Sequence, residues 1–212
     1  MSDPLRQRLL NATLPHVPFD GWSERALRAG AASANVKWPA VRRAFPGGAG
    51  DMLGFWNAEG DCQMIDALAE QDLGTMRIRE RIATCVRLRI EPLSGHREAL
   101  RLALTRAALP ANAPVALRAL WRTVDAMWHA AGDTATDFNF YSKRGLLAGV
   151  YAATLLYWLD DTSEDYAETW AFLDRRIADV LKVPKATSRL KLLLPNPDRL
   201  FRAFAQRRAA RG

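Results

Sequence analysis

The run from Leu146 to Leu159 constrains the fold most strongly, because it is apolar on nearly every side and only small Ala, Gly and Thr residues interrupt it. A helix that is apolar around its whole circumference is buried by the rest of its protein. The run is also too short to cross a bilayer unaided, which takes about 20 residues. We therefore predict that it forms the central helix of a soluble, all-α protein.

The segment before this run carries a second apolar face and a polar joint. Trp121, Val124 and Trp128 recur at spacings of three and four, so they share one face of a helix. A polar joint from Gly132 to Asp137 separates that helix from the apolar run. The motif DFNFYSKR, residues 137–144, then crowds aromatic and basic side chains at the start of the central helix. Packing alone does not require such a cluster, so it is a candidate functional surface.

The rest of the chain has helical periodicity broken by Pro and Gly, without a convincing strand alternation. Three short helices are expected before Gly48, and their pattern resembles a helix-turn-helix. A fourth helix is predicted from Asp51 to about Gly74 and a fifth from Thr75 to Ile90. The polar face of the fifth helix is predicted to hold Arg77, Arg79, Arg81, Arg87 and Arg89. About nine helices precede the tail, and we expect a head (1–48), a helical body (49–182) and a basic amphipathic tail (183–212).

The positive charge of the protein is concentrated at its C-terminus. Residues 182–212 contain nine Lys or Arg and one Asp, whereas the preceding residues contain 21 basic and 22 acidic side chains. Apolar groups set among basic ones are typical of a helix that lies on anionic lipid. The residues expected to contact the membrane are Leu200, Phe201, Arg202, Phe204, Arg207 and Arg208. Docking on the body or on a partner subunit, and binding to nucleic acid, are the alternatives for this tail.

No pattern in the sequence indicates an active site. Cys62 and Cys85 have no metal-site spacing and fit a reducing compartment, and the N-terminus does not resemble a signal peptide. Phosphate loops, nucleophile elbows and zinc patterns are missing from the sequence. We therefore predict a non-enzymatic protein without catalytic residues, metal or cofactor.

Two groups of polar residues are candidates for a metal site and for an acid–base site. His129 lies four residues from both Asp125 and Asp133, a spacing that a metal ion can use. A histidine hydrogen-bonded to a carboxylate is the simpler expectation. The acidic residues from Asp160 to Asp165 are predicted to cap helices at a junction rather than to carry acid–base chemistry.

Several longer motifs resemble known proteins. The N-terminal third, in which a small-residue helix, a turn and a short helix end at Phe45, resembles the DNA-binding head of the TetR repressors. The motifs WHAAGDTATDFNFYSKR (128–144) and YWLDDTSEDYAETWAFLDRRI (157–177) resemble the ubiquinone-biosynthesis accessory proteins. Those proteins have a TetR-like fold, bind lipid and assist the demethoxyubiquinone hydroxylase. The resemblance covers roughly residues 15–182 and does not reach the tail.

The resemblance implies a non-enzymatic protein that binds an isoprenoid quinone intermediate, or another lipid such as phospholipid, and presents it to the hydroxylase. Residues 49–182 would then be the lipid-binding and dimerisation domain. The resemblance also implies a homodimer formed through the last core helices, peripheral to the cytoplasmic face of the inner membrane and held on its anionic surface by the tail. The partner-binding residues would be Asp137, Phe140, Tyr141, Lys143 and Arg144. Phe140 stands where many relatives have Trp or Tyr, which changes the polarity of that surface. One buried and one exposed aromatic is the alternative arrangement for Phe140 and Tyr141.

Large apolar side chains are the candidates for lining the lipid cavity, and an ordinary core is the alternative for each: Trp121, Trp128, Tyr151, Leu155 and Trp158. Two other functions stay open, a TetR-type DNA-binding repressor that responds to a lipophilic ligand and a lipid carrier without an enzyme partner. The third helix offers Lys37, Arg42 and Arg43, but Pro39 to Val41 occupy its reading positions. Residues 19–48 contain five basic and two acidic side chains, which is modest for binding phosphates. Nucleic acid is therefore disfavoured as a partner.

Overall fold

The computed structural model describes residues 3–132 and 138–193, and it describes side chains for residues 3–132 and 143–180. The α-helices are α1 (Pro4–Thr13), α2 (Val17–Asp20), α3 (Glu24–Ser33), α4 (Trp38–Ala44), α5 (Ala49–Ala69), α6 (Ile78–Ile90), α7 (Arg97–Ala107), α8 (Ala113–Ala130), α9 (Phe138–Asp160) and α10 (Ala167–Leu193). Short 3₁₀ helices are η1 (Leu14–His16), η2 (Glu91–His96) and η3 (Glu164–Tyr166). The described residues contain no strand, and none of their helices is long and apolar enough to cross a membrane.

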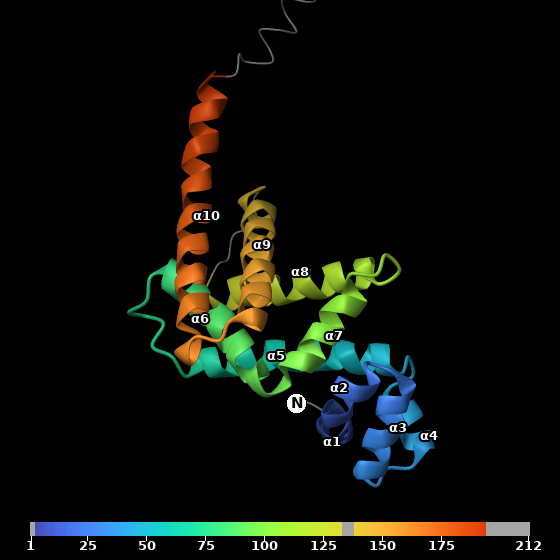
Figure 1. Cartoon of the computed structure of the whole chain (residues 1–212). Helices are drawn as coiled ribbons and strands as arrows, with labels where there is room; N and C mark the ends of the chain where they lie inside the picture. Colours follow the sequence, from blue (N-terminus) through green and yellow to red (C-terminus); the bar gives the residue numbers. More distant parts are fainter. Residues whose placement is uncertain (1–2, 133–137, 194–212) are drawn as a thin grey trace, which may run out of the picture.

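The first four helices form a small head at one end of the molecule (Figure 1). Ser23 begins α3 as its N-cap, because its hydroxyl accepts a hydrogen bond from the Ala26 amide. Gly30 lets α3 approach α1 closely, since a Cβ at this position would collide with Thr13. The core of the head consists of apolar side chains that are almost fully buried: Leu9, Leu10, Val17, Trp22, Ala26, Leu27, Val41 and Phe45.

Trp22 anchors the head to the rest of the protein. Its indole Nε1 donates a hydrogen bond of 2.9 Å to the carbonyl of Ala99 in α7. Its ring lies 5.2 Å, centroid to centroid, from the ring of Trp56 in α5. Met52 of α5 and Ala103 of α7 belong to the same buried cluster. The head core therefore continues into the body without a gap.

Helices α5, α6, α8, α9 and α10 build the larger core of the body. The predicted helical run 146–159 lies inside α9, and Trp158 within it is completely buried. The predicted boundary between the fourth and fifth helices was wrong, because α5 ends at Ala69 and α6 begins at Ile78. The side chain of Asp72 accepts a hydrogen bond from the Gly74 amide in the connecting turn, a local bond that competes with helix formation.

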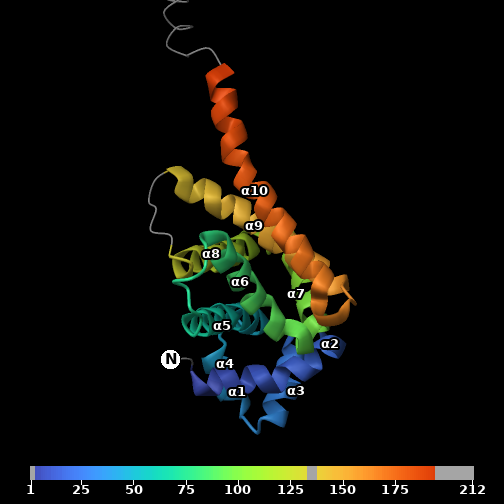
Figure 2. The same cartoon turned by 90° about the vertical axis from the view of Figure 1, so that its left-hand side faces the viewer.

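Helices α9 and α10 run antiparallel and stand out from the body (Figures 1 and 2). The rings of Tyr157 in α9 and Phe172 in α10 stack at 4.7 Å between centroids, with an interplanar angle of 11°. The far end of α10 lies at the opposite end of the molecule from the head, as both views show. The first part of the predicted tail, residues 183–193, continues α10, and its end at Leu193 is remote from the head.

A buried ion pair joins α5 to α6 in the middle of the body. Arg89 Nε lies 2.9 Å from Asp61 Oδ1, and both side chains are less than one-tenth exposed. The carboxylate of Asp61 also accepts a hydrogen bond from the Thr123 hydroxyl of α8. The sequence pattern assigned Arg89 to the polar face of its helix, and that prediction was wrong because the partner carboxylate lies on another helix.

Candidate functional site

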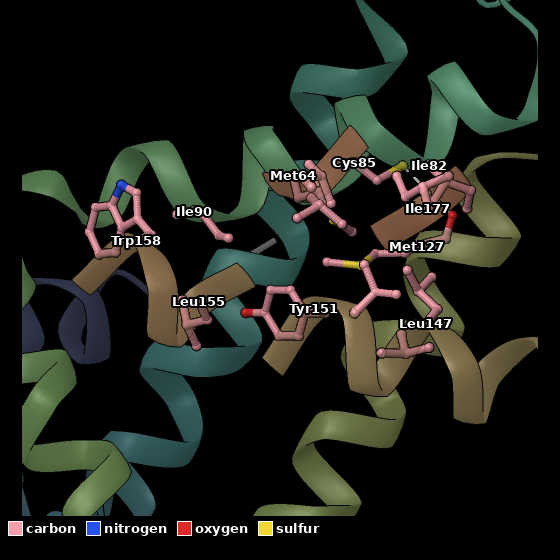
Figure 3. Packing of buried hydrophobic residues seen from close by; sticks show 14 of the residues in the cluster. Met64, Ile82, Cys85, Ile90, Met127, Leu147, Tyr151, Leu155, Trp158 and Ile177 are labelled. Carbon is pink, nitrogen blue, oxygen red and sulfur yellow. Dashed lines mark hydrogen bonds between the residues drawn. The ribbon is translucent and has the colours of Figure 1, made fainter. Parts of the chain in front are cut away.

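A small apolar pocket lies where α6, α8, α9 and α10 meet. Its volume is about 40 Å³. It is lined by Ile78, Ile82, Trp128, Leu147, Val150, Ile177 and Val180, with Arg79 and Lys143 beside them. Figure 3 shows Ile82, Leu147 and Ile177, which come from α6, α9 and α10, in the same part of the core.

Helical spacing explains how each element contributes to this pocket. Lys143, Leu147 and Val150 are separated by four and three residues, so they share one face of α9. Ile177 and Val180 are three residues apart, so they share one face of α10. The pocket is therefore the seam at which apolar stripes of several helices face one another, and a movement of α10 relative to α9 would change its size.

Basic side chains lie beside the pocket in different environments. The Lys143 ammonium lies 5.6 Å from the centre of the Trp128 ring, within the range of a cation–π contact. Arg144 is 3% exposed, and its Nε pairs with the carboxylate of Asp125 in α8. That burial does not fit the prediction that Arg144 faces a partner, because its guanidinium links α9 to α8 instead.

The other predicted partner-binding residues cannot be placed in this way. Asp137 lies outside the described residues, as do the side chains of Phe140 and Tyr141 in α9. The predicted membrane-binding residues of the tail, Leu200 to Arg208, also lie outside the described part of the chain. Both groups stay predictions.

The five predicted lipid-lining residues occupy three different environments. Trp128 lines the apolar pocket. Tyr151, Leu155 and Trp158 are 6%, 6% and 0% exposed and pack within the core cluster, without lining the pocket. Trp121 is 38% exposed on α8. The lining residues Ile177 and Val180 were missed, because their periodicity places them on an apolar face of α10 without saying which helix they meet.

Two titratable groups of the body, Tyr151 and Cys85, are buried in its core. Burial raises the pKa of the Tyr151 phenol above its ordinary value, and burial also raises the pKa of Cys85 to about 12. The neutral forms of both groups are therefore stabilised at physiological pH. Within residues 3–132 and 138–193, no three His, Cys, Asp or Glu side chains converge in a way that could hold a metal ion. Of the two carboxylates spaced to bond His129, that of Asp125 pairs with Arg144, and Asp133 lies outside the described residues.

Comparison with known proteins places this arrangement in context. Residues 113–184, which span α8, α9 and most of the described α10, match the COQ9 family model. The chain is 32% identical over 196 residues to the mitochondrial ubiquinone biosynthesis protein COQ9 of Rattus norvegicus, a match that covers 89% of this chain and 62% of the relative. The chain is similar to the COQ9 proteins over most of its length. The human COQ9 protein is 31% identical, with 89% of this chain and 61% of the human protein covered. This chain thus spans about three-fifths of the length of those COQ9 relatives.

A solved structure identifies the fold. The TetR transcriptional regulator from Nitrosomonas europaea superposes with a TM-score of 0.69, covering 84% of this chain and 99% of the regulator. The two sequences are 20% identical, so the likeness concerns the fold alone. It confirms the prediction of an all-α, TetR-like fold. The COQ9-like segment supplies three of the four helices that enclose the apolar pocket.

Proposed function

We propose that this protein acts in ubiquinone biosynthesis as a non-enzymatic accessory protein that binds an isoprenoid quinone intermediate or a related lipid. The observation that carries the proposal is the coincidence of the COQ9-like segment with the apolar seam between α8, α9 and α10. Ligand sites between the helices of a bundle are formed in this way, from side chains on facing helices. The apolar walls favour a hydrocarbon chain over a polar metabolite.

The closed pocket is smaller than an isoprenoid chain. A volume of about 40 Å³ has room for about three water molecules. A chain of several isoprene units would therefore enter only if α10 moves away from α9. Tyr157 and the half-buried Phe172 stack across this seam at the surface, whereas Leu173 and Ile177 of α10 belong to the buried core. Opening the seam would therefore expose apolar side chains, which a bound hydrocarbon chain would cover.

The second part of the proposal concerns the partners. The motif at residues 137–144 adjoins the pocket through Lys143, which suits a surface where a hydroxylase collects the bound lipid. A homodimer through α9 and α10, and a membrane contact through the tail, complete the proposed assembly at the cytoplasmic face of the inner membrane. Helix α10 ends at Leu193, opposite the head (Figure 1), so the head would not obstruct a membrane contact at that end of the molecule.

Filling the pocket tests whether lipid binds there. Val180→Trp places a large side chain at the α10 wall, and we expect the amount of co-purified isoprenoid lipid to fall roughly tenfold, in line with the 1–3 kcal/mol that overpacking costs. Organic extraction followed by mass spectrometry measures the lipid bound per protein. Val115→Trp is the matched control, because Val115 is 60% exposed on α8 and does not line the pocket. Equal lipid content in both variants, or no lipid in the wild-type protein, would contradict the proposal.

The tail is tested by charge reversal. Changing Arg202, Arg207 and Arg208 to Glu should weaken sedimentation with anionic vesicles about 100-fold, because each basic side chain near such a surface contributes about 1 kcal/mol. The matched control reverses three charges in the head, Lys37, Arg42 and Arg43, whose side chains are exposed at the opposite end of the molecule. If the head variant loses as much binding as the tail variant, the tail does not direct the contact.

A further inference from the structure

A second cavity lies at the joint between the head and the body. Its volume is about 120 Å³, and it is bounded by α1, α5, the end of α6 and η2. It shares no lining residue with the apolar pocket. Its polar wall includes Gln7, Asn11, Gln63, Arg89 and His96, and Trp56 supplies an aromatic wall.

Arg89 brings a donor to this cavity from the buried ion pair. Its Nε donates to Asp61 Oδ1 at 2.9 Å, and its Nη2 donates to the carbonyl and to the side-chain oxygen of Asn57 at 3.1 and 2.8 Å. Within the described part of the chain, Nη1 donates no hydrogen bond, although the side chain is only 4% exposed. Arg89 lines the cavity, so Nη1 can donate to a ligand oxygen there without giving up a bond to the protein.

Gly60 makes room for that donor. A Cβ at position 60 would lie 2.7 Å from both Cζ and Nη1 of Arg89, closer than such atoms approach in real proteins. Gly60 and Arg89 both line the cavity. Any larger residue at position 60 would therefore displace the guanidinium from its place in the wall.

An unused acceptor belongs to the same cavity wall. The amide nitrogen of Gln7 donates to Asn11 Oδ1 at 3.0 Å. The Oε1 atom of Gln7 is buried and has no hydrogen-bond partner among the described residues. The wall thus contains an unused donor on Arg89 and an unused acceptor on Gln7.

The charges around the cavity favour a neutral ligand. Asp61 pairs with Arg89 and also with the half-exposed Arg122, and the Glu59 side chain belongs to the cavity wall. Two cations therefore lie near two carboxylates, and a ligand carboxylate or phosphate would lose its hydration without gaining an excess of positive charge. A neutral group that both accepts and donates hydrogen bonds matches the wall without this cost.

We propose that this cavity binds a small, neutral, planar molecule that carries an amide or urea group. The carbonyl oxygen accepts from Arg89 Nη1, the N–H donates to the amide-lined side of the wall that includes Gln7, and the planar part packs against Trp56. The proposal is independent of lipid binding, because the apolar pocket lies on other helix faces.

Nicotinamide is the probe, with the full-length protein titrated by calorimetry and by ligand-observed NMR. We expect saturable binding of nicotinamide, and binding roughly tenfold weaker for nicotinate, which is charged, and for 3-methylpyridine, which lacks the amide. Equal binding of all three compounds, or no saturable binding of nicotinamide, would overturn the proposal.

Substitutions in the cavity wall test whether nicotinamide binds in this cavity. Gln7→Met removes the acceptor with little change in side-chain size, and Gly60→Ala displaces the guanidinium; we expect each to weaken nicotinamide binding roughly tenfold. Gln71→Met is the matched control, because Gln71 is exposed after the end of α5 and lies outside the cavity. If Gly60→Ala does not fold, Gln7→Met decides alone, and unchanged affinity in that variant rejects the site. Lipid content should be the same in Gln7→Met as in the wild-type protein, which separates this test from that of the lipid pocket.

Discussion

Replacing Asp61 with alanine is expected to lower the free energy of unfolding by about 3–5 kcal/mol. The reason is that Arg89 stays buried at 4% exposure after its counter-ion has been removed. The substitution also removes the nearer of two acceptors of the Thr123 hydroxyl, and the carboxylate that lies 3.4 Å from Arg122. Since domains of this size are stable by only about 5–15 kcal/mol, the variant should be close to unfolding at room temperature. Urea denaturation followed by circular dichroism measures the loss.

Two controls identify the buried charge as the cause. The double variant Asp61→Leu with Arg89→Met removes both charges, and it should recover most of the lost stability because no uncompensated ion remains. Glu24→Ala breaks the exposed pair with Arg28, in which both side chains are more than half exposed, and should change the free energy of unfolding by less than about 1 kcal/mol. If the double variant is as unstable as Asp61→Ala, shape and packing explain the effect and charge does not.

The Asp61–Arg89 pair shows which features the sequence predicts and which it does not. Regular apolar spacing predicts a helix from Thr75 to Ile90, and α6 confirms it except for the first turn, because the helix begins at Ile78. That spacing also grouped Arg89 with Arg77 and Arg79, which are both exposed. Arg89 differs from them because Asp61, 28 residues earlier in the chain, meets it inside the body. No local pattern encodes such a contact, since it depends on how α5 packs against α6.

The sequence predicted some residues of the apolar pocket and not others. The motif around residues 128–144 drew attention to Trp128 and Lys143, and both line or border the apolar pocket. The α6 wall is about 100 residues away from the α10 wall in sequence, so Ile82 and Ile177 could not be paired before the topology was known. Large aromatic side chains were also overvalued, because Trp158 fills the core completely whereas the pocket is bordered mainly by aliphatic ones.

The turn between α9 and α10 leads to the second large effect. Asp161 Oδ1 accepts a hydrogen bond of 2.8 Å from the Ser163 amide, and Oδ2 accepts from the amide and the hydroxyl of Thr169. The acidic residues of this junction were predicted to cap helices, and Asp161 does so from a nearly buried position, at 6% exposure. Asp161→Ala should therefore lower the free energy of unfolding by about 2–3 kcal/mol, the range for hydrogen bonds to a charged group. It should also loosen α10, which forms one wall of the apolar pocket.

The pH dependence of stability gives this prediction a distinct signature. Burial alone would raise the pKa of Asp161, but hydrogen bonds from Thr169 and Ser163 outweigh it and lower the pKa from 3.8 to about 2. A carboxylate whose pKa is lower in the folded state than in the unfolded state stabilises the protein when the pH is above the unfolded-state pKa. This contribution disappears as the pH falls from about 4 to about 2. Thermal unfolding of the wild-type protein across this range should include a loss of about 2 kcal/mol that is missing in Asp161→Asn. Asp160→Asn is the matched control, because its side chain is 80% exposed and pairs with Arg101 at the surface. If both variants lose stability in acid as the wild-type protein does, the carboxylate of Asp161 does not hold the turn in its charged form.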